Sequence, residues 1–367
     1  MHLPKLLAAF LLIGLLTLPL RAGDEKTHSF MYFTSPDGAQ GGGSGTGILI
    51  FDMNDGHKFV RRINIPDFKE GVRGVCASAV THRLYASTSL KRIVCLDLET
   101  DKILWNKTYD TGVDRLTISP DGKTLYAPCG YWSRDHKSWA VIDANDGRQL
   151  SEIPTPSPGH NTVMSLDGKR VFLASNSWLS VVDTKDNTVL KNIETDSHNF
   201  FPLTVNSDRS KVYCCLGREV GFQIIDPDAG KILETVYPDG DHIKMRTHGV
   251  GLTPDEKEIW IAEQNGTDIF VFDNTVNPPK QSAKMQIGQK GHGWISFSRD
   301  GKFGYTSSVE VFDAHTKKVV AIFKDENGKP VCSSKTVEVI FHGPNVVEVG
   351  DQFGVGRLHP PAQSPGN

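Results

Sequence analysis

The chain has 367 residues, with 40 Lys and Arg against 43 Asp and Glu, and a formal net charge of −3. This near-balance argues against a nucleic-acid partner, because binding through phosphate neutralisation needs a strong excess of basic side chains. The 35 glycines and 20 prolines are typical of a chain that turns often.

The first 22 residues have the layout of a secretory signal. Lys5 precedes an apolar run from Leu6 to Leu18, and Arg21 and Ala22 follow, so we expect cleavage after Ala22. The apolar run is short for a membrane span, so we expect no stable span, with an uncleaved anchor as the alternative. The mature chain would then be periplasmic or secreted and begin near residue 23.

Seven short apolar stretches each end in an aspartate, and successive aspartates are 40 to 47 residues apart. A period in the forties with β-rich units is the signature of a propeller. Each aspartate precedes a polar turn whose backbone a short carboxylate can hydrogen-bond, so we predict a structural role for all of them. These residues are Asp52, Asp97, Asp143, Asp183, Asp226, Asp273 and Asp313.

Superposing the repeats predicts the strands of one blade. In the third unit, two strands flank residues 119–123 (SPDGK), where proline presets one turn dihedral and glycine takes a positive one. The second strand of each unit carries an aromatic column, and the third strand ends in the aspartate. The column is formed by Tyr85, Tyr126, Phe172, Tyr213, Trp260 and Tyr305.

The two ends of the repeat region complete each other. Residues 29–35 (SFMYFTS) look like a second strand without a first, and residues 335–341 (KTVEVIF) look like a first strand without its blade. Pairing them would close the ring and remove exposed sheet edges. We therefore predict an all-β fold, a seven-bladed β-propeller of four-stranded antiparallel blades over residues 23–358. Residues 346–353 are interpreted as an extra strand, and residues 359–367 as a disordered tail.

The blade pattern SPDGKTLY (119–126) followed by VID (141–143) resembles the YVTN-repeat propellers, a family of exported bacterial β-propellers that includes YncE-like and quinoprotein amine dehydrogenase β-chain-like proteins. Related seven-bladed propellers include lactonase-like enzymes, the haem d1 domain of nitrite reductase and the copper-binding domain of nitrous oxide reductase. The resemblance specifies the fold better than the activity, because a shared fold hosts many functions.

Polar side chains recur where the innermost strand of each blade begins. Aligning the units on the aromatic column places Arg73, Asp114, His160 and His248 at one position. Since inner strands converge on one axis, these side chains are expected to ring the mouth of the central channel. Neighbouring positions and loops on the same face add Arg115, Trp132, Asn161, His198, Glu263, His292 and Trp294.

Histidines gathered from different blades can hold a metal or act as a general base. The candidate metal ligands for a divalent ion are His160, His198, His248 and His292, and the candidate catalytic residues are His160, His248 and His292. A hydrogen-bonded, water-filled channel mouth is the alternative for each of them. Arg73 and Arg115 would suit an anion such as a carboxylate or phosphate.

Three functional hypotheses follow. The first is a ligand-binding propeller whose His- and Arg-lined pocket takes a small anionic or polar ligand, or a protein partner on the same face. The second is a periplasmic lactonase-like or metal-assisted hydrolase or lyase. The third is a copper or haem-type redox protein, against which the chain has no CxxCH motif for covalent haem.

The six cysteines show no framework spacing. We predict that they are small buried hydrophobic residues, with a pair between Cys76 or Cys95 and Cys129 left open.

Overall fold

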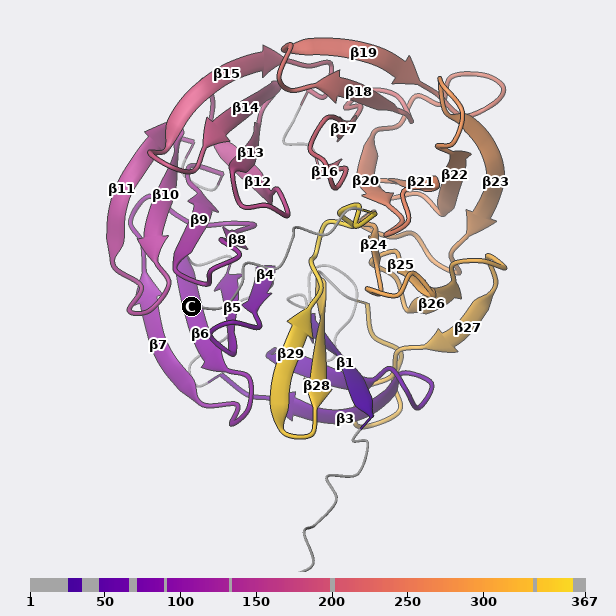
Figure 1. Cartoon of the computed structure of the whole chain (residues 1–367). Helices are drawn as coiled ribbons and strands as arrows, with labels where there is room; N and C mark the ends of the chain where they lie inside the picture. Colours follow the sequence, from indigo (N-terminus) through magenta and orange to yellow (C-terminus); the bar gives the residue numbers. More distant parts are fainter. Residues whose placement is uncertain are drawn as a thin grey trace, which may run out of the picture.

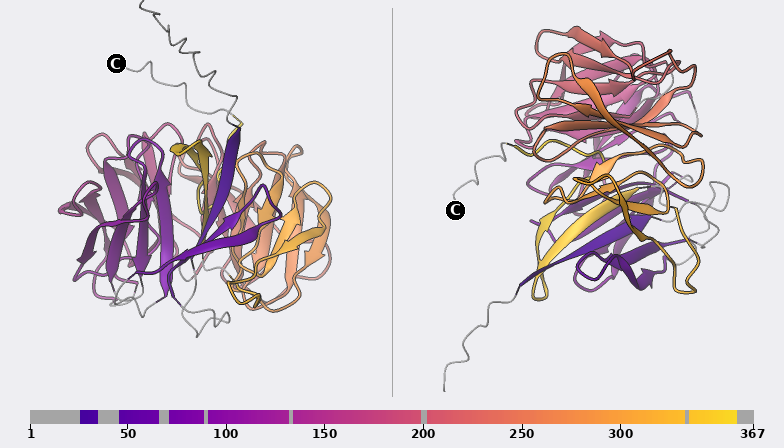
Figure 2. Two further views of the ribbon diagram at one scale, coloured as in Figure 1. Left: turned by 90° about the horizontal axis from the view of Figure 1, so that it is seen from below. Right: turned by 90° about the vertical axis from the view of Figure 1, so that its right-hand side faces the viewer.

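The computed structural model describes residues 26–34, 46–65, 71–88, 91–131, 134–198, 202–332 and 335–358. Seven antiparallel sheets stand around a central axis, and none of these residues is helical (Figure 1). Seen from the side, the blades form a thick disc (Figure 2). The predicted all-β, seven-bladed propeller is confirmed. In the described ranges no helix is long and apolar enough to cross a membrane. The predicted signal segment (1–22) and tail (359–367) lie outside them.

Blades two to seven each run from the inner to the outer strand in chain order. Blade two contains β4 (Val72–Ser78), β5 (Arg83–Thr88), β6 (Arg92–Asp97) and β7 (Ile103–Thr108). Blade three contains β8 (Thr117–Ile118), β9 (Thr124–Pro128), β10 (Ser138–Asp143) and β11 (Gln149–Pro154). Blade four contains β12 (Gly159–Met164), β13 (Arg170–Ser175), β14 (Trp178–Asp183) and β15 (Thr188–Glu194). Blade five contains β16 (Leu203–Val205), β17 (Val212–Cys215), β18 (Phe222–Asp226) and β19 (Lys231–Val236). Blade six contains β20 (Thr247–Leu252), β21 (Glu258–Glu263), β22 (Asp268–Asp273) and β23 (Lys280–Gln286). Blade seven contains β24 (Ser296–Phe297), β25 (Phe303–Tyr305), β26 (Glu310–Asp313) and β27 (Val319–Ile322).

Blade one is built from both ends of the described chain. β28 (Thr336–His342) pairs antiparallel with β1 (Thr27–Thr34), and β2 (Ile48–Asp52) and β3 (Lys58–Ile63) complete the sheet. The predicted ring closure is therefore confirmed. β29 (Asn345–Val349) adds a fifth strand beside β28, so the interpretation of residues 346–353 as an extra strand holds only up to Val349.

The repeated aspartates act as predicted. Each of the seven accepts hydrogen bonds from backbone N–H groups two or three residues ahead, as Asp97 does from Glu99 and Thr100. The carboxylate thereby satisfies donors that the tight turn after the third strand leaves without a strand partner. The residues of the aromatic column are all buried, and Trp260 is fully buried against Phe297 at 5.0 Å between ring centroids.

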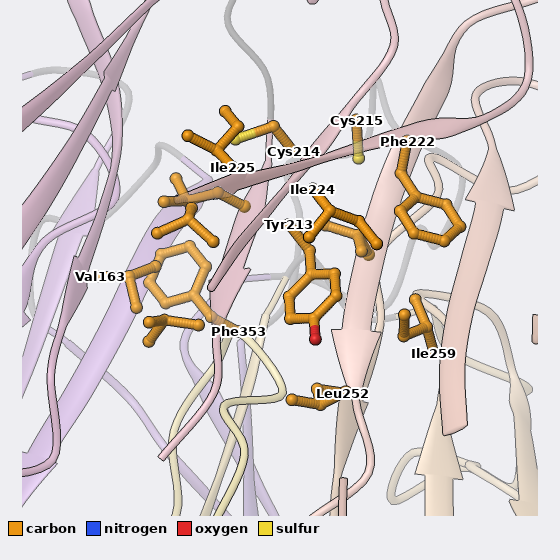
Figure 3. Close-up of a cluster of buried hydrophobic side chains, with 14 of the residues drawn as sticks. Val163, Tyr213, Cys214, Cys215, Phe222, Ile224, Ile225, Leu252, Ile259 and Phe353 are labelled. Atoms are coloured by element: carbon orange, nitrogen blue, oxygen red, sulfur yellow. The ribbon is translucent and has the colours of Figure 1, made fainter. Parts of the chain in front are cut away.

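The six cysteines are buried and free, as predicted, and no disulfide joins any two of them. Burial raises the pKa of the Cys214 thiol, and that of its neighbour Cys215, well above the usual range. Both thiols pack in the largest apolar cluster (Figure 3). They therefore behave as small hydrophobic side chains.

The channel is not empty. After β29, residues 351–357, here called the channel segment, cross the middle of the ring (yellow in Figure 1). Its backbone bonds to the inner strands of blades five and six: Leu252 N donates to Gly354 O at 2.8 Å, and Gly356 N donates to Val205 O at 3.0 Å. Phe353 joins the largest apolar cluster, near Val163 in Figure 3.

Candidate functional site

The inner strands begin on one face of the disc, here called the loop face. They end at the tight turns on the opposite face, the turn face, as at residues 119–123. Three inner strands, β4, β12 and β20, carry one extra residue near their start, and this bulged residue is Arg73, His160 and His248 respectively. A bulge re-aims its side chain. In blade three, Arg115 forms a parallel bridge with Asn161, which places Asp114 level with His160. The equivalence predicted from the aligned repeats is confirmed.

Glycine follows the bulge where two neighbouring inner strands approach closely. A Cβ on Gly74 would lie 2.7 Å from Arg115 Cα, and a Cβ on Gly249 would lie 2.8 Å from Trp294 N. Only the absence of a side chain allows this spacing. The two glycines thereby let the next blade bring Arg115 and Trp294 to the channel mouth.

A group of polar and aromatic side chains, here called the mouth cluster, fills the channel on the loop face. Asp114 and Arg115 are 0% exposed, and His160 and Lys335 are 1% exposed. Buried charges need partners or they destabilise the fold strongly. The cluster consists of Arg73, Asp114, Arg115, Tyr131, His160, His248, His292, Trp294 and Lys335.

Asp114 is the only carboxylate of the mouth cluster. His160 Nδ1 donates to Asp114 Oδ2, Arg115 Nη1 lies 3.4 Å from the same oxygen, and Arg73 Nε lies 3.5 Å from Oδ1. Burial alone would raise the pKa of Asp114, but His160, Arg115 and Arg73 outweigh burial and hold that pKa below its usual range. The carboxylate is therefore ionised at neutral pH.

His160 has both ring nitrogens engaged. Nδ1 donates to Asp114, and Arg115 Nη1 donates to Nε2. The ring also stacks on Tyr131 with centroids 4.3 Å apart. Burial and the nearby Arg115 lower the pKa of His160 to about 3, against the opposing effect of Asp114. His160 is thus a neutral linker that fixes the carboxylate and the guanidinium, and neither nitrogen is left to take a proton from a substrate.

His248 and His292 pack against each other and make fewer hydrogen bonds than His160. His248 Nδ1 donates to Gly293 O at 2.9 Å, and the two imidazoles meet edge to face with centroids 4.2 Å apart. His292 Nε2 is buried and has no hydrogen-bond partner among the described residues. Burial lowers the pKa of both rings, reinforced by Arg115 at His248 and by His248 at His292.

Two basic side chains lie against the indole of Trp294. Arg115 Cζ lies 5.0 Å and Lys335 Nζ 3.6 Å from the ring centroid, both within cation–π range. Burial lowers the pKa of Lys335 well below its usual range, with further lowering by Arg115 and Arg73 and opposition from Asp114. Arg115 Nε and Nη2 make no hydrogen bond within the described ranges. The cluster thus keeps open donors beside a surplus of positive groups.

Asn161, Glu263 and His198, which the sequence also predicted as site residues, are not part of the mouth cluster. Asn161 is fully buried beside Arg115 in the backbone bridge between blades three and four. The carboxylate of Glu263 accepts a bond from Asp268 N within its own hairpin, and burial raises its pKa. His198 is half-buried in the connection between blades four and five, and no ring contact described here joins it to the other three histidines. Trp132 lies outside the described residues.

The described residues contain no group of three or more His, Cys, Asp or Glu side chains arranged to hold a metal ion. A metal at His160, His198, His248 and His292 therefore stays a prediction that the donor arrangement does not support.

Sequence reasoning missed Lys335, Tyr131 and the channel segment. Lys335 stands directly before β28, so extending the alignment of inner-strand starts to the ring-closing strand would have found it. Tyr131 follows a second strand in a loop without a repeat, so no alignment signal existed for it.

The buried histidines predict a specific pH dependence of stability. Burial lowers the pKa of His160 to about 3 and that of His57 to about 4, so the folded state stays unprotonated where the unfolded chain, with a pKa of about 6.5, binds protons. The free energy of unfolding should therefore fall as the pH drops below about 6.5, by up to about 1.4 kcal/mol per pH unit for each such histidine. Urea denaturation from pH 7.5 to pH 5 measures the slope. His160→Gln should make the slope shallower, and replacement of the exposed His315 by glutamine should leave it unchanged; an equal slope in all three proteins would contradict this account.

No protein-family model matches the chain, and no curated protein matches it. Solved structures do match. Hydrazine synthase of Kuenenia stuttgartiensis is similar with a TM-score of 0.59 and 16% identity, over 80% of this chain and 99% of that chain. The Cps50 (Swd1) β-propeller domain of Myceliophteria thermophila is similar with a TM-score of 0.59 and 10% identity, over 72% of this chain and 88% of that chain. At such identities the likeness shows the seven-bladed propeller fold alone.

Proposed function

We propose that this protein is an exported, YVTN-type β-propeller, periplasmic or secreted, that binds a small anion in its mouth cluster. The observation that carries the proposal is the buried charge of the mouth cluster: two guanidiniums, Arg73 and Arg115, face its one carboxylate, Asp114. Lys335, whose pKa is lowered by burial, lies beside them. A buried surplus of positive charge is costly, and an incoming anion would neutralise it.

The open donors of the mouth cluster would supply hydrogen bonds to the anion. Arg115 Nε and Nη2 and His292 Nε2 have no hydrogen-bond partner in the described part of the chain. A guanidinium presents its donors in a planar fork that fits carboxylate and phosphate oxygens. Since His160 fixes the orientation of Arg115 through Nη1, the remaining donors of Arg115 are held in place before the ligand arrives. We therefore favour a carboxylate or phosphate ligand over an uncharged one.

The other hypotheses receive less support. A hydrolase or lyase would need a general base. His160 has both nitrogens engaged and His248 Nδ1 donates to Gly293 O, so His292 would have to supply the base through its Nε2, which is unbonded in the ranges that the structure describes. The copper and metal-assisted alternatives are favoured by a group of three or more donor side chains, and the described residues do not assemble one. The haem-type alternative, which needs only one or two axial ligands, stays a hypothesis. A protein partner on the loop face stays a hypothesis.

Titration calorimetry of the full chain with acetate, succinate, phosphate and gluconate tests the proposal. We expect one anion per chain, and at least tenfold weaker binding in Arg115→Gln, because a hydrogen bond to a charged group contributes about 1.5–3 kcal/mol. Arg73→Gln offers a second variant at a less buried site should Arg115→Gln fold poorly. The matched control is Arg218→Gln, an exposed arginine in a loop of the same face. Binding should also tighten as the pH is lowered, since an anion raises the lowered pKa of His292 and Lys335. Absence of binding by all four anions, or equal affinity in folded Arg115→Gln or Arg73→Gln, would overturn the proposal.

A further inference from the structure

A cavity opens on the turn face, on the other side of the channel segment from the mouth cluster. Its volume is about 580 Å³, within the range of small-molecule sites. Its walls are the turn-face ends of the inner strands of blades two to four and residues 347–357. We call it the turn-face cavity.

The cavity exists because the channel segment fills only one side of the channel. Arg357 N donates to Pro254 O at 2.8 Å, which ties the end of the segment to blade six, as Gly354 and Gly356 tie its middle to blades six and five. The ends of β4, β8 and β12 are left facing open space. Both walls are fixed by backbone hydrogen bonds, so the space is preformed.

A side chain of the channel segment separates this cavity from the mouth cluster. Gln352 Oε1 accepts from Val75 N at 3.3 Å, and Gln352 Nε2 donates to Leu116 O at 2.9 Å. Trp294 Nε1 donates to the Gln352 carbonyl. The side chain of Gln352 thus spans from the channel segment to blades two and three, with the cationic cluster on one side and the turn-face cavity on the other.

One wall of the cavity is apolar. The other wall carries charged side chains whose positive and negative charges cancel. Arg299 Nε lies 2.9 Å from Glu348, and Arg357 Nη2 lies 2.8 Å from Asp351, so each guanidinium already has a carboxylate. These pairs disfavour a charged ligand but leave hydrogen-bonding atoms at the rim. The apolar wall is formed by residues of blades two to four: Val75, Ala77, Ala79, Val80, Ile118, Pro120, Met164 and Leu166. Phe353 and Val355 add apolar side chains from the channel segment on the other wall.

Apolar side chains form the rim of the cavity in blades two to four. At the second position of the inner turn these blades carry Ala79, Pro120 and Leu166, all of which line the cavity. Blade six also has a proline there, Pro254, whereas blades five and seven carry Ser207 and Arg299. Val80, the next residue in blade two, is 67% exposed. Val80 therefore extends the apolar lining of the cavity out to its rim.

We propose that the turn-face cavity binds a neutral, mainly apolar small molecule with one hydrogen-bonding end, independently of the anion in the mouth cluster. The apolar body would lie against blades two to four, where it displaces water from unfavourable contact with Val80 and Leu166. The polar end would face the paired charges of Arg299 and Asp351.

Fluorescence titration of the full chain with the neutral probe N-phenyl-1-naphthylamine tests the proposal. We expect saturable binding of one probe per chain, and at least tenfold weaker binding in Ala79→Trp, whose indole would fill the cavity. The control is Val320→Trp, which places the same side chain on the outer strand β27 at a residue that is 52% exposed. Val80→Asp, at an exposed residue, provides a second variant that should also weaken binding should Ala79→Trp not fold.

Binding of the probe should be unchanged in Arg115→Gln and in the presence of saturating phosphate. Failure of the anion proposal would therefore leave this one testable. Non-saturable fluorescence, equal affinity in folded Ala79→Trp or Val80→Asp, or displacement of the probe by phosphate would overturn it.

Discussion

Replacing Phe353 with alanine is expected to lower the free energy of unfolding by about 3–5 kcal/mol, the usual cost of removing a buried aromatic side chain. Phe353 is 3% exposed, packs on Trp294 with ring centroids 5.4 Å apart, and belongs to an apolar cluster that joins blades four, five and six (Figure 3). Because no blade supplies this ring, its loss leaves a cavity where inner strands from different blades meet. Equilibrium unfolding in urea, followed by tryptophan fluorescence, measures the loss.

The matched control is Leu358→Ala, at a residue five positions further along the chain that is 53% exposed. It should change the free energy of unfolding by less than about 0.5 kcal/mol. A Phe353→Ala protein within 1 kcal/mol of the parent would show that the channel segment contributes little to the ring.

Replacing Asp114 with asparagine is expected to cost about 3–5 kcal/mol, because it leaves buried Arg73 and Arg115 without their carboxylate. The variant keeps the size of the side chain and one acceptor oxygen, so the loss reports charge rather than packing. The depressed pKa of Asp114 gives the sign of the pH effect. Its stabilisation is present above about pH 4 and is lost as the pH falls toward the folded-state pKa, so the difference between parent and variant should shrink in acid.

Asp241→Asn, at an exposed aspartate of the loop between blades five and six, is the control and should be nearly neutral. An Asp114→Asn protein as stable as the parent at pH 7 would mean that Arg73 and Arg115 do not depend on this carboxylate.

The period and the turn chemistry made the fold predictable. Asp97 and its six counterparts each solve the same local problem, a tight turn with unbonded N–H groups, so the solution repeats in the sequence. The ring closure of β1 with β28 was predictable because each end lacked the strand that the other carried. The column of Arg73, Asp114, His160 and His248 followed from the same alignment.

The remaining features depend on contacts that have no local pattern. A bulge at Arg73 or His248 is a property of strand pairing and leaves no residue signature except the glycine after it. The channel segment occurs once, so no period marks it, and its place is fixed by partners more than a hundred residues away, such as Thr204 Oγ1, which donates to Gly354 O. His198 was grouped with the other histidines because spacing alone cannot tell a connection from a strand start.

The most direct test of the central claim, an anion site made by the mouth cluster, is anomalous diffraction from crystals soaked in selenate. The account predicts one selenium peak per chain within hydrogen-bond distance of Arg115 Nη2 and His292 Nε2, the donors that the fold leaves open. Selenium peaks only at surface lysines and arginines, with the channel mouth free of selenate, would contradict it.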